Sequence, residues 1–299
     1  MASASRLQAE KETGDRPSRR GIKKGLYLIP SAFTAANISM GFYAVMAALR
    51  GFQLINSGAA SDLQRAAEFF DNAAKAICWA WLFDILDGRI ARMTKTTTEI
   101  GLQLDSLADV LTFGIAPSVL AYAWGYGPAF AEGSWEHKLG WFLSFMYLIC
   151  GAFRLARFNV QASRPRIMAE GLAKVDKKSF VGLPIPSAAV LIAAIIHFSP
   201  RPLIQYQPKY LALYSGLMMA LVGSLGALMI STIRYSSFKT VGTSGRSTRL
   251  ALLFIAAVGM LIYLFSEYVL LIIVAVYVLH GPILRLGSLF RKRSPKESQ

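Results

Sequence analysis

The stretch that decides the fold is Asp84-Ile-Leu-Asp-Gly-Arg-Ile-Ala-Arg92, continued after eight residues by Gly101-Leu-Gln-Leu-Asp-Ser-Leu-Ala-Asp109. It holds four aspartates between apolar segments that have the composition of membrane spans. A carboxylate at the centre of a membrane helix costs roughly 2.5–3.5 kcal/mol on insertion scales. A chain keeps four of them only where something compensates their charge, and a divalent metal ion is the compensation that we expect.

The rest of the chain has the composition of a polytopic membrane protein. Its 299 residues are 54% hydrophobic and its mean hydropathy is +0.43, which is more apolar than an ordinary soluble domain. Several stretches reach the roughly 20 residues that a helix needs to cross a bilayer. We predict an all-α integral membrane bundle of about eight transmembrane helices, at residues 27–49, 73–90, 104–124, 139–158, 181–198, 210–230, 250–265 and 268–286.

The basic residues predict the orientation of these helices. A formal net charge of +15, from 32 lysines and arginines against 17 aspartates and glutamates, would indicate a nucleic-acid partner in a soluble protein. Here the positive-inside rule explains it better, so no nucleic-acid partner is expected. We predict a bacterial-type inner or plasma membrane location, cytoplasmic termini and a cytoplasmic active site. With that orientation the basic residues left on the outer side are Arg50, Arg65, Lys75, Lys138, Arg201 and Lys209.

The predicted organisation is one membrane domain with a short basic tail at each end. Residues 1–24 and 291–299 are predicted to be disordered cytoplasmic tails, and residues 25–240 form the membrane core. Residues 241–290 add two helices that carry Glu267 as their one acidic residue, which indicates scaffold or a dimer surface rather than chemistry. Residues 56–71 form either a short amphipathic helix on the outer surface or a plain loop.

Helical spacing divides the four aspartates into two pairs. Residues three and four apart share one face of a helix. One face holds Asp84, Asp87, Gly88 and Ala91 at the end of the second span, and another holds Gly101, Asp105 and Asp109 at the start of the third. Because residues 93–100 form a short connection, the two spans are antiparallel neighbours and the carboxylates can converge near the cytoplasmic boundary.

Such a cluster predicts a metal site, because four close carboxylates cannot all ionise without cations. Oxygen ligands without His or Cys favour Mg²⁺, Mn²⁺ or Ca²⁺, and two ions about 3.5–4 Å apart would suit phosphoryl transfer. The small residues leave room for a phosphate-bearing ligand, and Arg92 adds a positive charge for a phosphate or a base edge. Two alternatives stay open: the aspartates could line the proton or cation pathway of a transporter, and the glycines could serve helix packing.

The complete pattern D-x-x-D-G-x-x-A-R-(8)-G-x-x-x-D-x-x-x-D resembles the signature of the CDP-alcohol phosphotransferases, with every fixed position present. The resemblance implies a six-helix catalytic core, one or two Mg²⁺ or Mn²⁺ ions, and cleavage of a CDP-linked lipid or alcohol with release of CMP. It implies the metal ligands Asp84, Asp87, Asp105 and Asp109, with Asp105 and Asp109 as the catalytic pair. Asp109 would also take the proton of the attacking hydroxyl. The positions that match the lining of the CDP pocket are Gly88, Ala91, Arg92 and Gly101.

Further segments resemble one branch of this family, the bacterial and archaeal phosphatidylserine synthases. These segments are residues 104–109, 113–118, 150–159, 180–186 and 231–239. The branch implies CDP-diacylglycerol and L-serine as substrates in the lipid bilayer, and it raises a homodimer as a candidate assembly. Glycerol-3-phosphate, inositol and choline stay open as other acceptors; a phosphate-bearing acceptor would need a larger basic cluster, and choline an aromatic cage.

Polar residues near the cytoplasmic ends of the fourth and sixth spans are candidates for binding the acceptor. They are Arg154, Arg157 and Asn159 after the fourth span, and Arg234 and Lys239 after the sixth. Alternatively, the basic ones anchor the helices by snorkelling to lipid phosphates, or hold the lipid phosphate or the cytidine diphosphate. The histidines lie away from the aspartates and are interpreted as packed or solvated: His137, His197 and His280.

Overall fold

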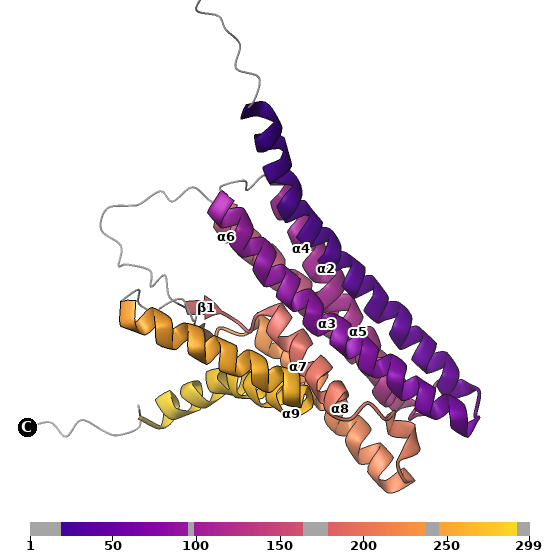
Figure 1. Ribbon diagram of the computed structural model, residues 1–299. Helices are drawn as coiled ribbons and strands as arrows, with labels where there is room; N and C mark the ends of the chain where they lie inside the picture. The colour runs from indigo at the N-terminus through magenta and orange to yellow at the C-terminus, as the bar shows by residue number, and fades with distance from the viewer. Residues whose placement is uncertain (1–18, 95–98, 164–178, 237–244, 292–299) are drawn as a thin grey trace, which may run out of the picture.

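The chain forms a bundle of long helices, which Figure 1 shows as a ribbon. This computed structural model describes residues 19–94, 99–163, 179–236 and 245–291. In chain order the elements are α2 (Arg19–Asn56), α3 (Ala60–Thr94), α4 (Glu99–Asp109), η1 (Val110–Ile115), α5 (Ala116–Ala121), η2 (Tyr122–Tyr126), α6 (Trp135–Ser163), β1 (Ser179–Val181), α7 (Ile185–Phe198), η3 (Leu203–Gln205), α8 (Pro208–Ile230), β2 (Arg234–Ser236) and α9 (Gly245–Arg291). The predicted helical membrane bundle is confirmed. Within the described ranges its one sheet is the short antiparallel pair β1–β2.

The number of membrane-spanning helices is the part of the prediction that is not confirmed. Among the described residues, six stretches are long and apolar enough to cross a membrane: Ala32–Asn56, Ile100–Tyr126, Trp135–Val160, Ile185–Gln205, Pro208–Ile230 and Gly259–Arg285. The predicted span 73–90 lies in α3, which is less apolar because it carries charged residues such as Asp84, Asp87 and Arg89. The last two predicted spans both lie in α9.

Helix α9 is a hairpin of two arms. Its backbone leaves the helical region at Phe265, where φ is −138° and ψ is 48°, and the two arms run back side by side from there (Figure 1). The bend falls at the end of the predicted span 250–265, so the sequence located the break between the two helices.

Two element boundaries differ from the sequence interpretation. Helix α2 begins at Arg19, inside the segment 1–24 that was predicted to be disordered, while residues 1–18 and 292–299 lie outside the described residues. Helix α3 begins at Ala60 and continues without interruption to Thr94. Of the two interpretations of residues 56–71, the helix is therefore right from Ala60 on, but as the first turns of α3 rather than a separate surface helix.

Small residues allow α2 and α3 to pack closely along their length. Buried alanines at steps of three and four face each other from the two helices: Ala44, Ala47 and Ala48 on α2, and Ala73, Ala76 and Ala80 on α3. Side chains of this size let two membrane helices approach closely, and the contact is then stabilised by dispersion. This contact aligns the aspartate-bearing end of α3 with the polar residues of α2.

The helix that carries Asp105 and Asp109 changes its winding directly after Asp109. Residues Val110–Ile115 form a π-helical segment, an uncommon wide turn that is frequent at functional sites. Neighbouring helices hold this segment from two sides. The Thr112 hydroxyl donates to the Asn37 carbonyl of α2 at 3.2 Å, and the Tyr147 hydroxyl of α6 donates to the Phe113 carbonyl at 3.1 Å. The carboxylate of Asp109 is thus placed by a turn that is anchored to two other helices.

A glycine turn brings the start of α7 to the aspartate-bearing end of the bundle. Gly182 has φ +83°, and a Cβ there would collide with the Met229 carbonyl oxygen, so the turn requires glycine. Its N–H donates to the Ile233 carbonyl at 2.8 Å, which ties the turn to the segment after α8. Helix α7 then begins with Pro184 as its N-cap and Pro186 in its first turn, as expected for prolines at a helix start.

Candidate metal and substrate site

Three of the four motif aspartates converge at one end of the bundle. Asp84 comes from α3, and Asp105 and Asp109 come from α4; one carboxylate oxygen of each lies within 4.8 Å of the other two. All three residues are half-buried. The helical spacing that predicted two facing pairs therefore brings carboxylates of both helices together, in a cluster with excess negative charge.

The chemistry of this cluster fits a hard divalent cation. Its ligands are all oxygens, which suits Mg²⁺ or Mn²⁺. In addition, Asp109 Oδ1 is buried and has no hydrogen-bond partner among the described residues. Because a buried polar atom without a hydrogen-bond partner lowers the stability of the fold, this oxygen is available to bind a metal ion or another ligand.

The fourth aspartate lies apart from this group and has its own partner. Asp87 is 6% exposed and accepts a hydrogen bond from the Thr34 hydroxyl of α2. It is one turn further along α3 than Asp84, on the side that packs against α2. Its assignment as a metal ligand stays a prediction, and the structure adds Thr34 as the residue that orients it.

The residues expected to line the CDP pocket lie on the two helices that carry the aspartates. Gly88 on α3 and Gly101 on α4 are exposed. Ala91 and Arg92 lie near the end of α3, and their side chains are outside what the structure describes, as are residues 95–98 of the connection. The pocket role of these four residues stays a prediction.

Two of the acceptor candidates come from α6 and reach the aspartate-bearing helix. Arg154 is half-buried, its guanidinium interacts electrostatically with Asp109, and its Nε is buried without a hydrogen-bond partner among the described residues. The Asn159 side chain donates to Ser106 Oγ at 2.8 Å, and Ser106 lies between Asp105 and Asp109 on α4. A cation with a free donor next to a carboxylate with a free acceptor is an arrangement that can bind a polar ligand between them.

Of the remaining acceptor candidates, Arg157 is the one whose side chain the structure describes. Arg157 Nη2 lies near the Gly182 turn, at 3.3 Å from the position that a Cβ would take there. Arg234 is in β2, where its backbone pairs with Val181 of β1, and its side chain is not described. Lys239 lies outside the described residues. The structure thus brings Arg154 and Asn159 to the aspartates and places Arg157 at the start of α7.

The sequence interpretation missed two polar residues of α2. Thr34 holds Asp87, and Asn37, one turn further on, is 1% exposed with neither amide atom hydrogen-bonded to any described residue. The signal was present, because two polar residues three apart in a largely apolar span share one helix face. That face points to α3 and to the π-helical segment after Asp109, so α2 borders the site together with α3 and α4.

The fold and the site define the class as integral membrane proteins of helical-bundle type, with a carboxylate-centred site between two antiparallel helices. The chain belongs to the CDP-alcohol phosphatidyltransferase family, whose model matches residues 27–223. The match covers α2 to most of α8 and includes every motif residue. The chain is therefore a transferase of phospholipid biosynthesis that is integral to a membrane.

Relatives carry a more specific name. The chain is 33% identical over 240 residues to a CDP-diacylglycerol–serine O-phosphatidyltransferase of Helicobacter pylori, covering 78% of this chain and 82% of that protein. It is 36% identical over 172 residues to the protein of that name in Saccharomyces cerevisiae, covering 57% and 54% of the two chains. A Methanocaldococcus jannaschii protein of the same name is 32% identical over 167 residues, covering 56% and 65%.

Proposed function

We propose that this protein transfers the phosphatidyl group of CDP-diacylglycerol to L-serine, which forms phosphatidylserine and releases CMP. The observation that carries the proposal is the packing of α6 on the helix of Asp109, because hydrogen bonds on either side, from Asn159 to Ser106 and from Tyr147 to Phe113, bring Arg154 to the level of Asp109. Serine brings a carboxylate for the cation and a hydroxyl for the carboxylate. The names of the relatives from a bacterium, an archaeon and a yeast support the same acceptor.

The charged residues of the site have separate roles in the proposed reaction. Arg154 pairs with the serine carboxylate, and Asn159 with Ser106 borders the same space on α4. The serine hydroxyl is thereby directed to Asp109 and to the β-phosphorus of the lipid substrate. Its oxygen forms the new bond to that phosphorus, its proton passes to Asp109, and the bond from the β-phosphorus to the CMP oxygen breaks. Most of the rate enhancement comes from positioning.

The metal site is part of the proposal. Asp84, Asp105 and Asp109 would hold one or two Mg²⁺ or Mn²⁺ ions, with Asp87 oriented by Thr34 as a further ligand. A divalent ion bound there would neutralise charge on the diphosphate during the transfer. Gly88 and Gly101 leave the backbone accessible to the CDP group, and Ala91 and Arg92 belong to the same pocket.

The proposed orientation places this end of the bundle at the cytoplasmic face, together with both termini. The positive-inside distribution of basic residues supports it. At that interface the lipid substrate reaches the aspartates from the bilayer and serine reaches them from water. The homodimer stays a prediction, because the structure contains a single chain.

An acceptor panel tests the proposal. Membranes containing the protein receive CDP-diacylglycerol and Mg²⁺ or Mn²⁺ with serine, glycerol-3-phosphate, inositol or choline in turn, and CMP release is measured. We expect CMP only with serine, and no CMP after chelation of the metal. Release with another acceptor and not with serine would reject the serine assignment, and no acceptor-dependent release at all would reject the transferase activity.

A further inference from the structure

A cavity lies between α3 and the connection from α7 to α8, at the end of the bundle remote from the motif. Its volume is about 650 Å³, within the roughly 300–1,000 Å³ that ligand pockets occupy. On one side it is lined by a single face of α3, because Gln64, Glu68 and Asp71 are spaced by steps of four and three. On the other side the connection contributes Arg201 and Gln205. We call it the distal cavity.

The length of α3 indicates where the distal cavity lies in the membrane. The helix is continuous from Ala60 to Thr94, so Gln64 and Asp84 are about 30 Å apart along its axis. This is about the thickness of the hydrocarbon core. Tyrosines, which are typical of a membrane interface, lie next to the cavity on the same connection and at the start of α8: Tyr206, Tyr210 and Tyr214. The cavity is therefore at the level of lipid headgroups, in the leaflet opposite the motif.

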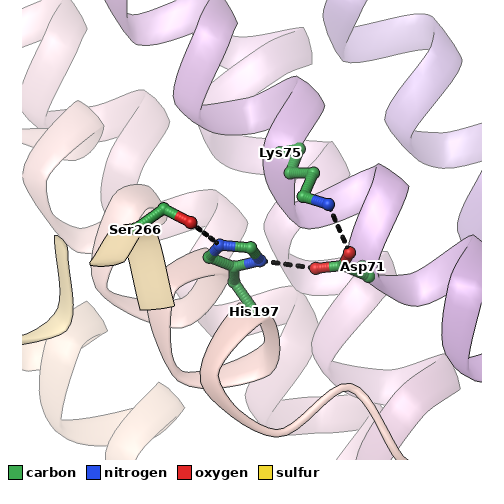
Figure 2. Close-up of polar contacts among 4 residues, drawn as sticks. All are labelled: Asp71, Lys75, His197 and Ser266. Atoms are coloured by element: carbon green, nitrogen blue, oxygen red, sulfur yellow. Dashed lines mark hydrogen bonds and ion pairs between the residues drawn. The ribbon is translucent and has the colours of Figure 1, made fainter. Parts of the chain in front are cut away.

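A polar cluster holds the α3 side of the distal cavity in place. Figure 2 shows His197 of α7 between Asp71 and Ser266 of α9. His197 Nδ1 is 2.5 Å from Asp71 Oδ1 and its Nε2 is 2.8 Å from Ser266 Oγ, while Lys75 Nζ is 2.6 Å from Asp71 Oδ2. Both carboxylate oxygens of Asp71 therefore have partners, so Asp71 shapes the cavity without adding a free charge to it.

The connection on the other side is also anchored. Gln205 Nε2 donates a hydrogen bond to the Leu63 carbonyl of α3 at 3.3 Å. Pro200 lines the cavity, and Pro202 precedes η3 as its N-cap, so fixed φ angles restrict this part of the chain. The two sides of the cavity are thus joined by a hydrogen bond and are built from restrained backbone.

Two charges of opposite sign remain free in the distal cavity. Glu68 and Arg201 both line it and are exposed, and neither has an ion-pair partner among the described residues. They do not pair with each other either. A ligand that carries both a cation and an anion can satisfy both residues through charge-assisted hydrogen bonds, whereas a ligand with a single charge leaves one of them unmatched.

The lining also limits the chemistry of such a ligand. Quaternary ammonium groups are recognised by aromatic rings, and no aromatic side chain is among the described residues that line the cavity. A primary ammonium can instead donate hydrogen bonds to Glu68 and Gln64, and a phosphate suits the guanidinium of Arg201. Apolar residues complete the lining, which favours an amphiphile over a free polar solute: Leu63, Ala67 and Pro200.

We propose that the distal cavity binds the headgroup of a zwitterionic phospholipid with a primary ammonium, of the phosphatidylethanolamine type. Glu68 accepts hydrogen bonds from the ammonium, and Arg201 binds the phosphate. The bound lipid joins α3 to the connection between α7 and α8. This inference is independent of the acceptor in the proposed reaction, because the cavity lies about 30 Å along α3 from Asp84.

The test measures lipid binding to the purified full-length protein by native mass spectrometry. The protein is titrated with phosphatidylethanolamine, phosphatidylcholine or phosphatidylglycerol of identical acyl chains, and the apparent Kd of the first bound lipid is determined. We expect the wild type to bind phosphatidylethanolamine about fivefold more tightly than the other two, the size of one exposed ionic contact. Glu68→Gln and Arg201→Gln should each weaken that binding by a similar factor. The matched control is Arg65→Gln, because the Arg65 side chain is 60% exposed, pairs with Asp62 and does not line the cavity.

A charge reversal keeps the test decisive if the loss in these variants reflects poor folding. Glu68→Lys should shift the preference to the anionic phosphatidylglycerol by about fivefold, a gain that a folding defect cannot produce. Equal affinity of the wild type for the three lipids would overturn the proposal, as would an unchanged preference for phosphatidylethanolamine in the Glu68 and Arg201 variants. Soluble phosphoethanolamine that displaces the lipid at equal concentration would overturn the assignment to a membrane lipid.

Discussion

Two regions of helix α3 hold half-buried carboxylates in opposite states of pairing. Near its C-terminal end, Asp84 joins Asp105 and Asp109, and Asp109 keeps a buried oxygen without a partner among the described residues. About 20 Å back along the helix, Asp71 is bonded to both Lys75 and His197. The difference indicates where the functional site lies. Acids that are neutralised by partners within the chain stabilise the fold, whereas acids without such partners are available to bind a ligand.

The largest loss of activity is expected for Asp109→Asn, which tests whether the unpaired carboxylates carry the chemistry. The amide keeps the size of the side chain but cannot accept the serine proton and is a weaker metal ligand. We expect phosphatidyl transfer to fall about 10²- to 10⁴-fold, measured as CMP release, while the protein elutes as wild type in size-exclusion chromatography. Asp62→Asn is the matched control, because Asp62 at the start of α3 lies away from the site, is paired with Ser57 and Arg65, and should be replaceable without loss of activity. Near-normal turnover of the Asp109 variant would contradict its role.

The next effect concerns the hydroxyl that orients Asp87. Thr34→Val removes the donor to Asp87 without a change in side-chain shape. Residues that orient a metal ligand contribute about 10- to 100-fold to metal affinity or activity, so the Mg²⁺ or Mn²⁺ concentration for half-maximal activity should rise by about that factor. Ser224→Ala, which removes an exposed hydroxyl bonded to its own helix, serves as the control. An unchanged metal dependence would show that Asp87 does not act through the metal.

At the other end of α3, Asp71→Asn should lower stability and leave chemistry intact. Burial alone would raise the pKa of Asp71, but hydrogen bonds from His197 and Lys75 and their charges outweigh it, and the pKa is lowered. The carboxylate therefore stabilises the fold above its ordinary pKa, and that contribution is lost as the pH falls through the lowered folded-state pKa. We expect a loss of about 1–3 kcal/mol at neutral pH, read as a lower apparent Tm in detergent.

The pH dependence separates this explanation from a simple packing defect. The difference in Tm between wild type and Asp71→Asn should shrink as the pH is lowered through the range in which Asp71 protonates. A difference that stays constant with pH would mean that the charge of Asp71 does not contribute. A loss of kcat comparable to that of Asp109→Asn would contradict the division of roles between the two ends.

The smallest effect is expected for the exposed member of the same cluster. The Lys75 side chain is 50% exposed, and ion pairs at that exposure contribute about 0–1 kcal/mol. Lys75→Met should therefore shift the apparent Tm less than Asp71→Asn does, and the shift should become smaller at high salt. A larger shift than that of Asp71→Asn would show that Lys75, rather than His197, is the main partner of the carboxylate.

Much of the fold and part of the site could be predicted from the sequence. Apolar length located the helices, and the steps of three and four placed Asp84, Asp105 and Asp109 on faces that meet. Tertiary pairing could not be predicted in this way. Nothing in the spacing says that Asp87 bonds to Thr34, or that the helix winds into a π turn after Asp109, because both depend on how α2 packs on its neighbours.

Two other features were missed for a related physical reason. His197 was interpreted as packed or solvated, and only the fold shows it bridging Asp71 and Ser266, which are 126 and 69 residues away from it in the chain. Tyr277 lies in a span whose composition is that of a scaffold, and its ring packs beside that of Tyr235 because the hairpin turns back at Phe265. Long-range contacts of single polar side chains leave no periodic signal.

The central claim is that the open carboxylates of the motif carry the transfer of a phosphatidyl group to serine. The most direct measurement is to supply isotopically labelled serine and CDP-diacylglycerol to vesicles that contain the purified protein, and to identify the lipid product by mass spectrometry. We predict labelled phosphatidylserine in equal amount to the CMP released with wild type and with Asp71→Asn, and none above background with Asp109→Asn. Labelled lipid formed equally well by Asp109→Asn, or no labelled lipid from the wild-type protein, would contradict the account.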